Sequence, residues 1–359
     1  MWRPRLPKIL SSARKPSRTE SGRRFDALLQ EALFAHLAHD AETTERALTD
    51  AVRIDSDATD AYVALCRFYR GRGEIGRAIR LHQNLLLRSD LKPRERVKVL
   101  CELGQDFEAG GFLRRAVASF EEVIAHEPRN VDALRSLVEA LINLKEFEQA
   151  IPLEKRLAKF EKRDCTREAQ LWAHHGEHER DQGRASAARK AAKTALRRDK
   201  LCARALVLLG ELEVDRGKNK AALAAWAKVP ALDASLASEV YPKVEAAYAA
   251  IDRARDFEGF LRAKIEERPG DQETILALAR YLGSRGDADL ARIELKRLLD
   301  RSPANLEARL VLGRGLLAAG REEDIVSEYA TLLDLLEASI LATSQPSAPE
   351  GSTNAEEFE

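Results

Sequence analysis

The sequence lacks the paired cysteines that bind zinc or exchange electrons. Its four cysteines are isolated along 359 residues, and none belongs to a CxxC pair, so the cysteine pattern supports neither a zinc knuckle nor a redox motif. A reduced thiol at a packing position behaves as a small hydrophobe. We therefore expect a reducing, cytoplasmic compartment, no metal and no cofactor. The cysteines are Cys66, Cys101, Cys165 and Cys202.

Long apolar runs, strand patterns and an excess of one charge are also missing. No stretch approaches eighteen apolar residues, so we expect no transmembrane helix. Aromatic residues make up only 6% of the chain, and no long alternating run indicates strands. Charged residues reach 33% but sum to zero, which suits solvated helix faces better than nucleic-acid binding. The basic run at 189–200 is interpreted in the same way, and we expect no nucleic-acid partner.

Sequence patterns of active sites are absent as well. There is no phosphate loop, no Gly-x-Ser-x-Gly and no glycine-rich turn between a strand and a helix. His174, His175 and His178 form the one tempting cluster, and His174 and His178 lie one helical turn apart, a spacing that can bind a metal. No cysteine stands beside them, so we favour a solvated helix face. The sequence predicts no enzyme, no catalytic residue and no small-molecule substrate.

A ladder of small or tight residues runs along most of the chain. Most of its members are followed seven residues later by a glycine, with Lys145 as the exception, and twelve residues later by an alanine, with Ile325 as the exception. The intervals are 38, 34, 38, 34, 69 and 34 residues, and the interval of 69 holds two units. The ladder consists of Cys66, Gly104, Val138, Gly176, Gly210, Ala279 and Gly313.

A period near 34 residues with a glycine between two helices is the signature of the tetratricopeptide repeat. The small residue allows the two helices to cross closely, and the glycine ends the first helix in a left-handed conformation. Aromatic residues such as Phe107, Phe120 and Trp226 then fill the core. The predicted fold is all-α: a right-handed superhelical solenoid of about eight to nine helix pairs.

Composition divides the chain into three segments. Residues 1–24 hold eight basic residues, three prolines and the single acid Glu20, which predicts a disordered basic segment. Contact with an anionic membrane surface and an organellar transit peptide remain alternatives for it. The solenoid is predicted over residues 25–340, with its weakest unit at 232–268. Residues 341–359 carry acids but no base and are predicted to be a disordered acidic tail.

The first helix of each repeat is expected to line the inner wall of the solenoid. The predicted wall carries both Arg and Glu and lacks the lysine and asparagine pattern with which related repeats clamp chaperone carboxyl termini. A mixed wall suits a polar protein partner of mixed charge. The predicted partner-binding residues are Arg67, Arg70, Lys98, Gln105, Arg135 and Glu139.

Two segments go beyond the general repeat pattern: FYRGRGEIGRAIRLHQNLL at 68–86 and LGQDFEAGGFLRRAVASFEEV at 103–123. With the link LKPRERVKVL between them, they resemble the lipopolysaccharide assembly protein B family over roughly residues 25–330. Members of that family join a membrane helix, a cytosolic repeat solenoid and a rubredoxin-like metal knuckle. They are adaptors that help to present the deacetylase of lipid A synthesis to a membrane-anchored protease.

Only the middle part of that arrangement is seen in this sequence, so the resemblance leaves membrane anchoring and metal-dependent regulation in doubt. It implies a cytoplasmic, non-enzymatic adaptor that binds a protein, in lipopolysaccharide assembly or in the regulation of its synthesis. The alternative is a general assembly scaffold for another machine, such as one of secretion or motility.

Overall fold

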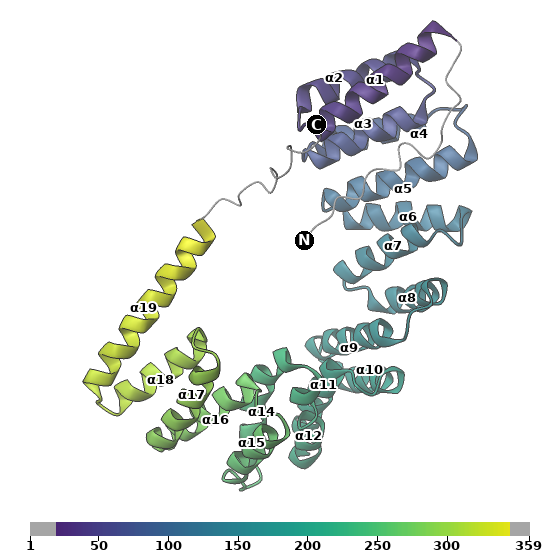
Figure 1. Ribbon diagram of the computed structural model, residues 1–359. Coiled ribbons are helices and arrows are strands. Elements are labelled where there is room, and N and C mark those ends of the chain that lie inside the picture. The colour runs from purple at the N-terminus through teal and green to yellow at the C-terminus, as the bar shows by residue number, and fades with distance from the viewer. Residues whose placement is uncertain (1–18, 345–359) are drawn as a thin grey trace, which may run out of the picture. The chain divides into compact units, whose positions relative to one another are not determined.

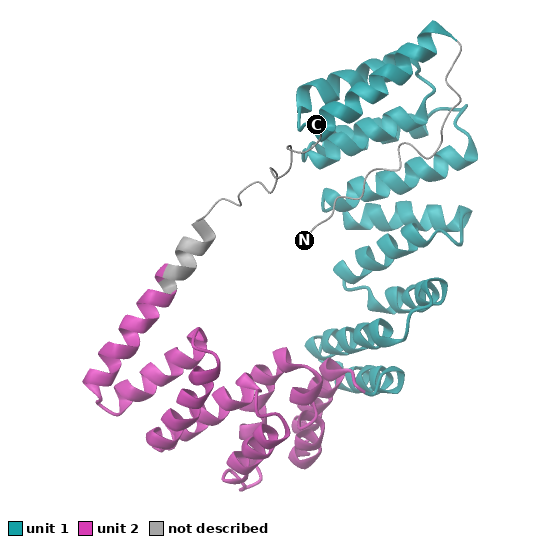
Figure 2. Ribbon diagram, viewed as in Figure 1, with its two compact units in different colours: residues 1–200 teal, residues 201–359 magenta. Residues whose placement is uncertain are grey.

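The computed structural model describes residues 19–344, which form helices and connecting turns with no strand among them (Figure 1). The chain divides into two compact units, Met1–Lys200 and Leu201–Glu359 (Figure 2). The predicted all-α class is confirmed.

The first unit consists of consecutive antiparallel helix pairs. The second helix of one pair also packs against the first helix of the next, as α4 does on α5 and α8 on α9. Stacking of this kind buries the apolar face of each pair on its neighbours. The helices are α1 (Glu20–Leu37), α2 (Ala41–Ile54), α3 (Thr59–Gly71), α4 (Ile75–Leu86), α5 (Pro93–Ala109), α6 (Leu113–His126), α7 (Val131–Asn143), α8 (Phe147–Glu161), α9 (Thr166–Asp181) and α10 (Ala185–Arg198).

The second unit continues the pairing with one irregularity. Between α12 and α14 the chain forms the four-residue helix α13 and the 3-10 helix η2, within and just before the unit predicted to be the weakest. The helices are α11 (Ala203–Val214), α12 (Asn219–Trp226), α13 (Val229–Leu232), η2 (Ala234–Leu236), α14 (Ala237–Ala249), α15 (Asp256–Glu267), α16 (Gln272–Ser284), α17 (Ala288–Arg301), α18 (Leu306–Ala318) and α19 (Glu322–Ser344).

The turns inside the repeats have the predicted left-handed backbone. All six glycines that stand seven residues after a ladder residue have positive φ, from 65° at Gly320 to 89° at Gly286. Lys145, the exception in the ladder, adopts the same conformation with φ 60°. His39 and Asp252 do so too, at φ 59° and 58°. They mark the turns of the first repeat and of the weak repeat, neither of which carries a glycine there.

Close crossing of the paired helices is confirmed at two of the predicted glycines. A Cβ on Gly104 would lie 2.5 Å from the ring of Phe120, and one on Gly210 would lie 2.1 Å from Nε1 of Trp226. Both aromatic rings are buried, so each fills the space that its glycine leaves open. Gly313 differs, because a Cβ there would meet no atom within 4 Å. The structure therefore leaves room for a side chain at this position.

The limits of the helical region differ from the prediction at both ends. Helix α1 begins at Glu20, five residues before the expected start, and the Thr19 hydroxyl accepts a hydrogen bond from the backbone of Gly22. A capping residue of this type begins a helix well, so residues 20–24 are helical. Helix α19 continues to Ser344, four residues past the expected limit. The rest of the two predicted disordered segments, 1–18 and 345–359, lies outside the described residues.

Candidate protein-interaction site

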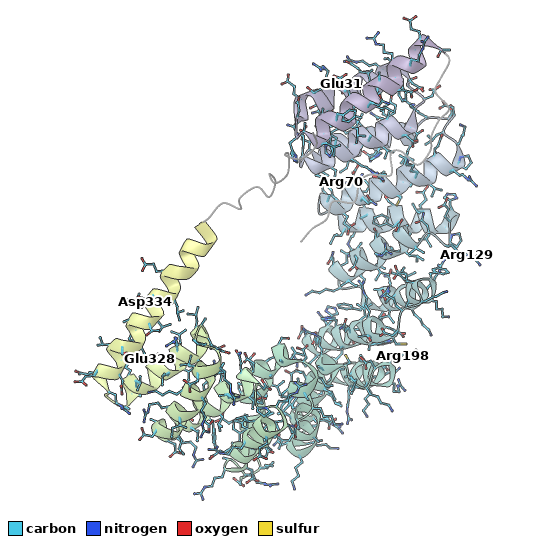
Figure 3. The ribbon with its side chains drawn as sticks, viewed as in Figure 1. Glu31, Arg70, Arg129, Arg198, Glu328 and Asp334 are labelled. Atoms are coloured by element: carbon cyan, nitrogen blue, oxygen red, sulfur yellow. The ribbon has the colours of Figure 1, made fainter. Side chains whose placement is uncertain are left out.

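Three of the six predicted partner-binding residues meet in one charged cluster between α3 and α5. Nε of Arg67 donates to Glu102 at 3.0 Å. Nη1 of Arg70 donates to Asp106 at 2.6 Å, and its Nη2 donates to Gln105 at 3.0 Å and to Glu102 at 3.0 Å. Figure 3 marks Arg70 where α3 passes α5. The cluster therefore ties the second repeat to the third.

The centre of this cluster is buried. Asp106 has no exposed surface, and behind it Nδ1 of His82 lies 2.6 Å from Oδ2 of the same carboxylate. His82 is itself fully buried. An ionised carboxylate in an apolar interior is costly unless charges and hydrogen bonds surround it. Arg70 supplies the charge, and Arg70 and His82 both lie within hydrogen-bond distance of the carboxylate, so Arg70 is a structural partner of Asp106 before it is a surface residue.

Glu102 shows the electrostatic balance of the cluster. Burial alone would raise the pKa of its carboxyl group, but the hydrogen bond from Arg67 and the charges of Arg67 and Arg70 outweigh this cost. The pKa of Glu102 therefore lies below its ordinary value of 4.5. The group stays ionised at neutral pH and holds both arginines in place.

A second charged cluster lies between α7, α8 and α9. Arg135 donates to Glu161, and Arg167 donates to Glu139. Glu154 of α8 is fully buried between these pairs. Its carboxylate lies 3.0 Å from Arg163 and 3.6 Å from Arg167, distances typical of ion pairs. Arg135 and Glu139, also predicted to bind a partner, thus belong to this cluster: it ties the fourth repeat to the fifth.

The sequence reasoning missed the two buried polar residues at the centres of these clusters, although the repeat register marks them. His82 and Glu154 each stand sixteen residues after a ladder residue, Cys66 and Val138. Phe120 and Trp226 occupy that position in apolar repeats. Both polar residues belong to the two repeats followed by a 38-residue interval. The longer links therefore coincide with charged contacts between repeats.

The six predicted residues thus divide by exposure. Lys98 pairs with Asp60 at the surface, and its side chain is 44% exposed. Arg67, Arg135 and Glu139 are similarly accessible, at 39%, 43% and 42%. Arg70, at 19%, is largely committed to buried acids. Replacing it would disturb the fold as well as any partner site, so charge reversal at Arg67 and Arg70 together is not a clean test of binding.

His175 of the histidine cluster is packed inside, which corrects the expectation of a solvated face for this residue, whereas His174 keeps 41% of its side chain exposed. His174, His175 and His178 lie around the ring of Phe147, with centroid distances of 6.0 to 6.3 Å. His175 is buried, because α9 packs on α8 at this point. Among residues 19–344, no group of three or more His, Cys, Asp or Glu is placed to hold a metal ion. No helix in that range is long and apolar enough to cross a membrane.

The repeat architecture has a match among known protein families. The family model of the tetratricopeptide repeat matches residues 101–164, 175–237 and 276–334, together more than half of the chain. The chain belongs to the tetratricopeptide repeat family. Packed helix pairs, left-handed turns and a 34-residue period agree with this assignment.

Curated relatives of this tetratricopeptide protein confirm the resemblance seen in the sequence. Lipopolysaccharide assembly protein B of Escherichia coli K12 is 28% identical over 259 residues, which cover 71% of this chain. The protein of the same name from Haemophilus influenzae is 25% identical over 248 residues, which cover 69% of this chain. The matches span 65% and 62% of the relatives' own lengths, in each case less than two thirds.

Two solved structures resemble this tetratricopeptide protein, at lower sequence identity than the curated relatives. A crystal structure of MamA protein has a TM-score of 0.36 at 17% identity and covers 48% of this chain and 92% of its own. The crystal structure of YrrB, described as a TPR protein with an unusual peptide-binding site, has a TM-score of 0.37 at 16% identity and covers 52% of this chain and 92% of its own.

Proposed function

We propose that this tetratricopeptide protein is a non-enzymatic adaptor that binds a protein partner and acts in lipopolysaccharide assembly or in the regulation of its synthesis. The observation that carries the proposal is the match to lipopolysaccharide assembly protein B over 71% of the chain. Stacked helical repeats serve as extended binding surfaces, because each repeat adds side chains to a continuous face. The resemblance makes the deacetylase of lipid A synthesis the first partner to test.

The proposed contact surface is made by the first helices of the second, third and fourth repeats. Lys98, Arg67, Arg135 and Glu139 are its accessible charged residues. Arg67 pairs with the buried Glu102, whereas Lys98, Arg135 and Glu139 form shallow, partly solvated pairs, and such pairs contribute little to stability. They can therefore be exchanged for pairs with a partner at small cost. Arg70 and Gln105 act as positioning residues that hold Arg67 and Glu102 in register.

The cellular role is tested by deleting the gene in its source organism and measuring lipopolysaccharide per cell. We expect the amount to change and to be restored by the wild-type gene. An unchanged amount, with other envelope or motility functions impaired, would favour the general assembly scaffold instead.

The contact surface is tested with purified proteins. Lys98→Glu and Arg135→Glu together should weaken binding of the deacetylase about tenfold or more in calorimetry, because two attractive contacts become repulsive. The control uses two exposed lysines on second helices of their repeats, Lys155 of α8 and Lys193 of α10. Lys155→Glu and Lys193→Glu together should leave the affinity unchanged. Equal weakening by both sets would contradict the proposed surface, whereas no binding by any form would contradict the proposed partner.

A peripheral position at the cytoplasmic face of the membrane is also part of this proposal. It rests on the basic residues of 1–18, which lie outside the described residues. Because α1 begins at Glu20, the test compares the full chain with a chain starting at Thr19. Only the full chain should sediment with vesicles rich in anionic lipid, and only at low salt.

A further inference from the structure

The last repeat leaves an apolar face uncovered. Val326 and Leu333 of α19 are 69% and 66% exposed, and Tyr329 between them is 49% exposed. Their spacing of three and four residues places them on one stripe of the helix. Leu310 of α18 is also exposed, at 48%. These four residues are called the open end surface.

In the other repeats, residues at the positions equivalent to Tyr329 and Leu310 are mostly buried. Tyr329 stands sixteen residues after Gly313, and the residue at that position is buried in every earlier repeat. Those residues are Leu48, His82, Phe120, Glu154, Ala192, Trp226, Leu261 and Leu295. Leu310 stands three residues before Gly313, where Val63, Ala173, Val207 and Leu276 are buried in other repeats.

Val326 and Leu333 correspond to Ile79 and Leu86 of the second repeat. Ile79 and Leu86 share an apolar cluster with Val97 and Leu100 of α5, the first helix of the next repeat. The open end surface is therefore shaped to receive an amphipathic helix, laid as the first helix of a further repeat would be.

The acidic residues of α19 indicate the charge that a helix bound there would carry. Helix α19 carries six acidic residues and no lysine or arginine. Glu328 forms a largely buried pair with Arg309 of α18 at 2.9 Å, and Asp324 forms an exposed pair with the neighbouring Arg321 at 2.6 Å. Exposed acids accompany the apolar stripe: Glu322, Glu323, Asp334 and Glu337. Figure 3 marks Glu328 and Asp334 on this helix.

We propose that the open end surface binds a basic amphipathic helix of a protein partner. Apolar side chains of that helix would cover Val326, Tyr329 and Leu333, and its lysines or arginines would face the acids beside them. Residues 345–359 of this chain offer four acids and no base, so their charge does not complement the surface. A second copy of α19 would bring the same acids into contact with themselves. The site is separate from the surface around Lys98 and Arg135, and neither proposal depends on the other.

The test uses two synthetic helical peptides of about 18 residues, or five turns, with identical leucine positions. One carries lysine and arginine at the flanking positions and the other carries glutamate. Fluorescence anisotropy with the full chain at low ionic strength should give a Kd at least about tenfold lower for the basic peptide. Glu322→Gln with Glu323→Gln should reduce that preference without removing the apolar contact.

Matched surface variants locate the site. Val326→Ser with Tyr329→Ser should weaken the basic peptide about tenfold or more. Phe34→Ser is the control, because Phe34 of α1 is also 69% exposed but lies in the first repeat. Far-ultraviolet circular dichroism and the midpoint of thermal unfolding should match the wild type in both, since the replaced side chains are exposed.

Three results would overturn the proposal. Equal binding of both peptides would show a general apolar contact, and unchanged binding by Val326→Ser with Tyr329→Ser would place the peptide elsewhere. A dimer of the wild-type chain in sedimentation equilibrium that this double variant dissociates would show that a second copy covers the surface.

Discussion

Arg70 of α3 and Asp106 of α5 are 36 residues apart in sequence, and their side chains meet at 2.6 Å around a carboxylate with no exposed surface. The contact joins two neighbouring repeats through charge, and it uses a residue that the sequence analysis predicted to face a partner. It gives the second repeat a fixed register on the third.

Removing Arg70 should therefore destabilise the protein strongly. In Arg70→Met the buried Asp106 loses its counter-charge, at a cost of about 3–5 kcal/mol, and the midpoint of urea unfolding should fall accordingly. Lys98→Met breaks an exposed pair with Asp60 and should cost less than about 1 kcal/mol. Similar midpoints for the two variants would show that Asp106 is satisfied without Arg70.

Acid should weaken the charged cluster between α3 and α5, because protonation of Glu102 lowers the stability of the fold. Its pKa is lower in the folded chain than its ordinary value of 4.5, so ionised Glu102 stabilises the fold above that pH. The stabilisation is lost as the pH falls from there through the folded pKa. Glu102→Gln should be less stable than the wild type at pH 7 and should lose less stability on acidification. Parallel stability curves from pH 7 to about 3 would contradict this.

The two helix crossings at Gly104 and Gly313 should respond oppositely to the same change. Gly104→Ala places a Cβ 2.5 Å from the ring of Phe120 and should cost about 1–3 kcal/mol through overpacking. Gly313→Ala meets nothing within 4 Å and should gain up to about 1 kcal/mol from helix propensity. Thermal unfolding of the two variants measures the difference, and a loss at both positions would show that α18 and α19 also cross closely.

Replacing Lys145 with glycine, the residue found at this turn position in the other repeats of the ladder, should stabilise the protein. Its left-handed backbone, with φ 60°, is unfavourable for any residue with a Cβ and favourable for glycine. Lys145→Gly should raise stability by about 0.5–1 kcal/mol. Lys155→Gly, inside α8, should lower it by about 1 kcal/mol. Urea midpoints that fall in both variants would show that the lysine side chain stabilises the turn more than its backbone costs.

Much of the fold can be predicted from sequence because the repeat constrains it locally. A glycine at a turn and a small residue at a crossing report a backbone requirement directly, and so Gly73, Gly286 and Gly104 could be placed in advance. His39 and Asp252 adopt the same left-handed conformation without being glycine, so the glycine pattern does not predict these two turns.

The charged clusters were harder to predict, because burial depends on the neighbouring repeat as well as on the residue's own helix. Arg67, Arg70 and Gln105 were correctly grouped on the first helices of their repeats. Their acceptors, Glu102 and Asp106, lie beside the predicted wall positions and become visible only when α3 and α5 are packed together. His82 and Glu154 could have been noticed by comparing repeats position by position.

The two charged clusters also bear on how the array comes apart. Buried ion pairs often add less net stability than apolar contacts of the same size, and the stability of a repeat array depends on each contact between neighbours. We therefore expect coupling between repeats to be uneven in this chain and weaker after α4 and after α8, where charged contacts stand beside the apolar ones. Helices α5 to α8 lie between these two charged contacts, with no break in the backbone at either. Their amides should therefore exchange with solvent as one cooperative group.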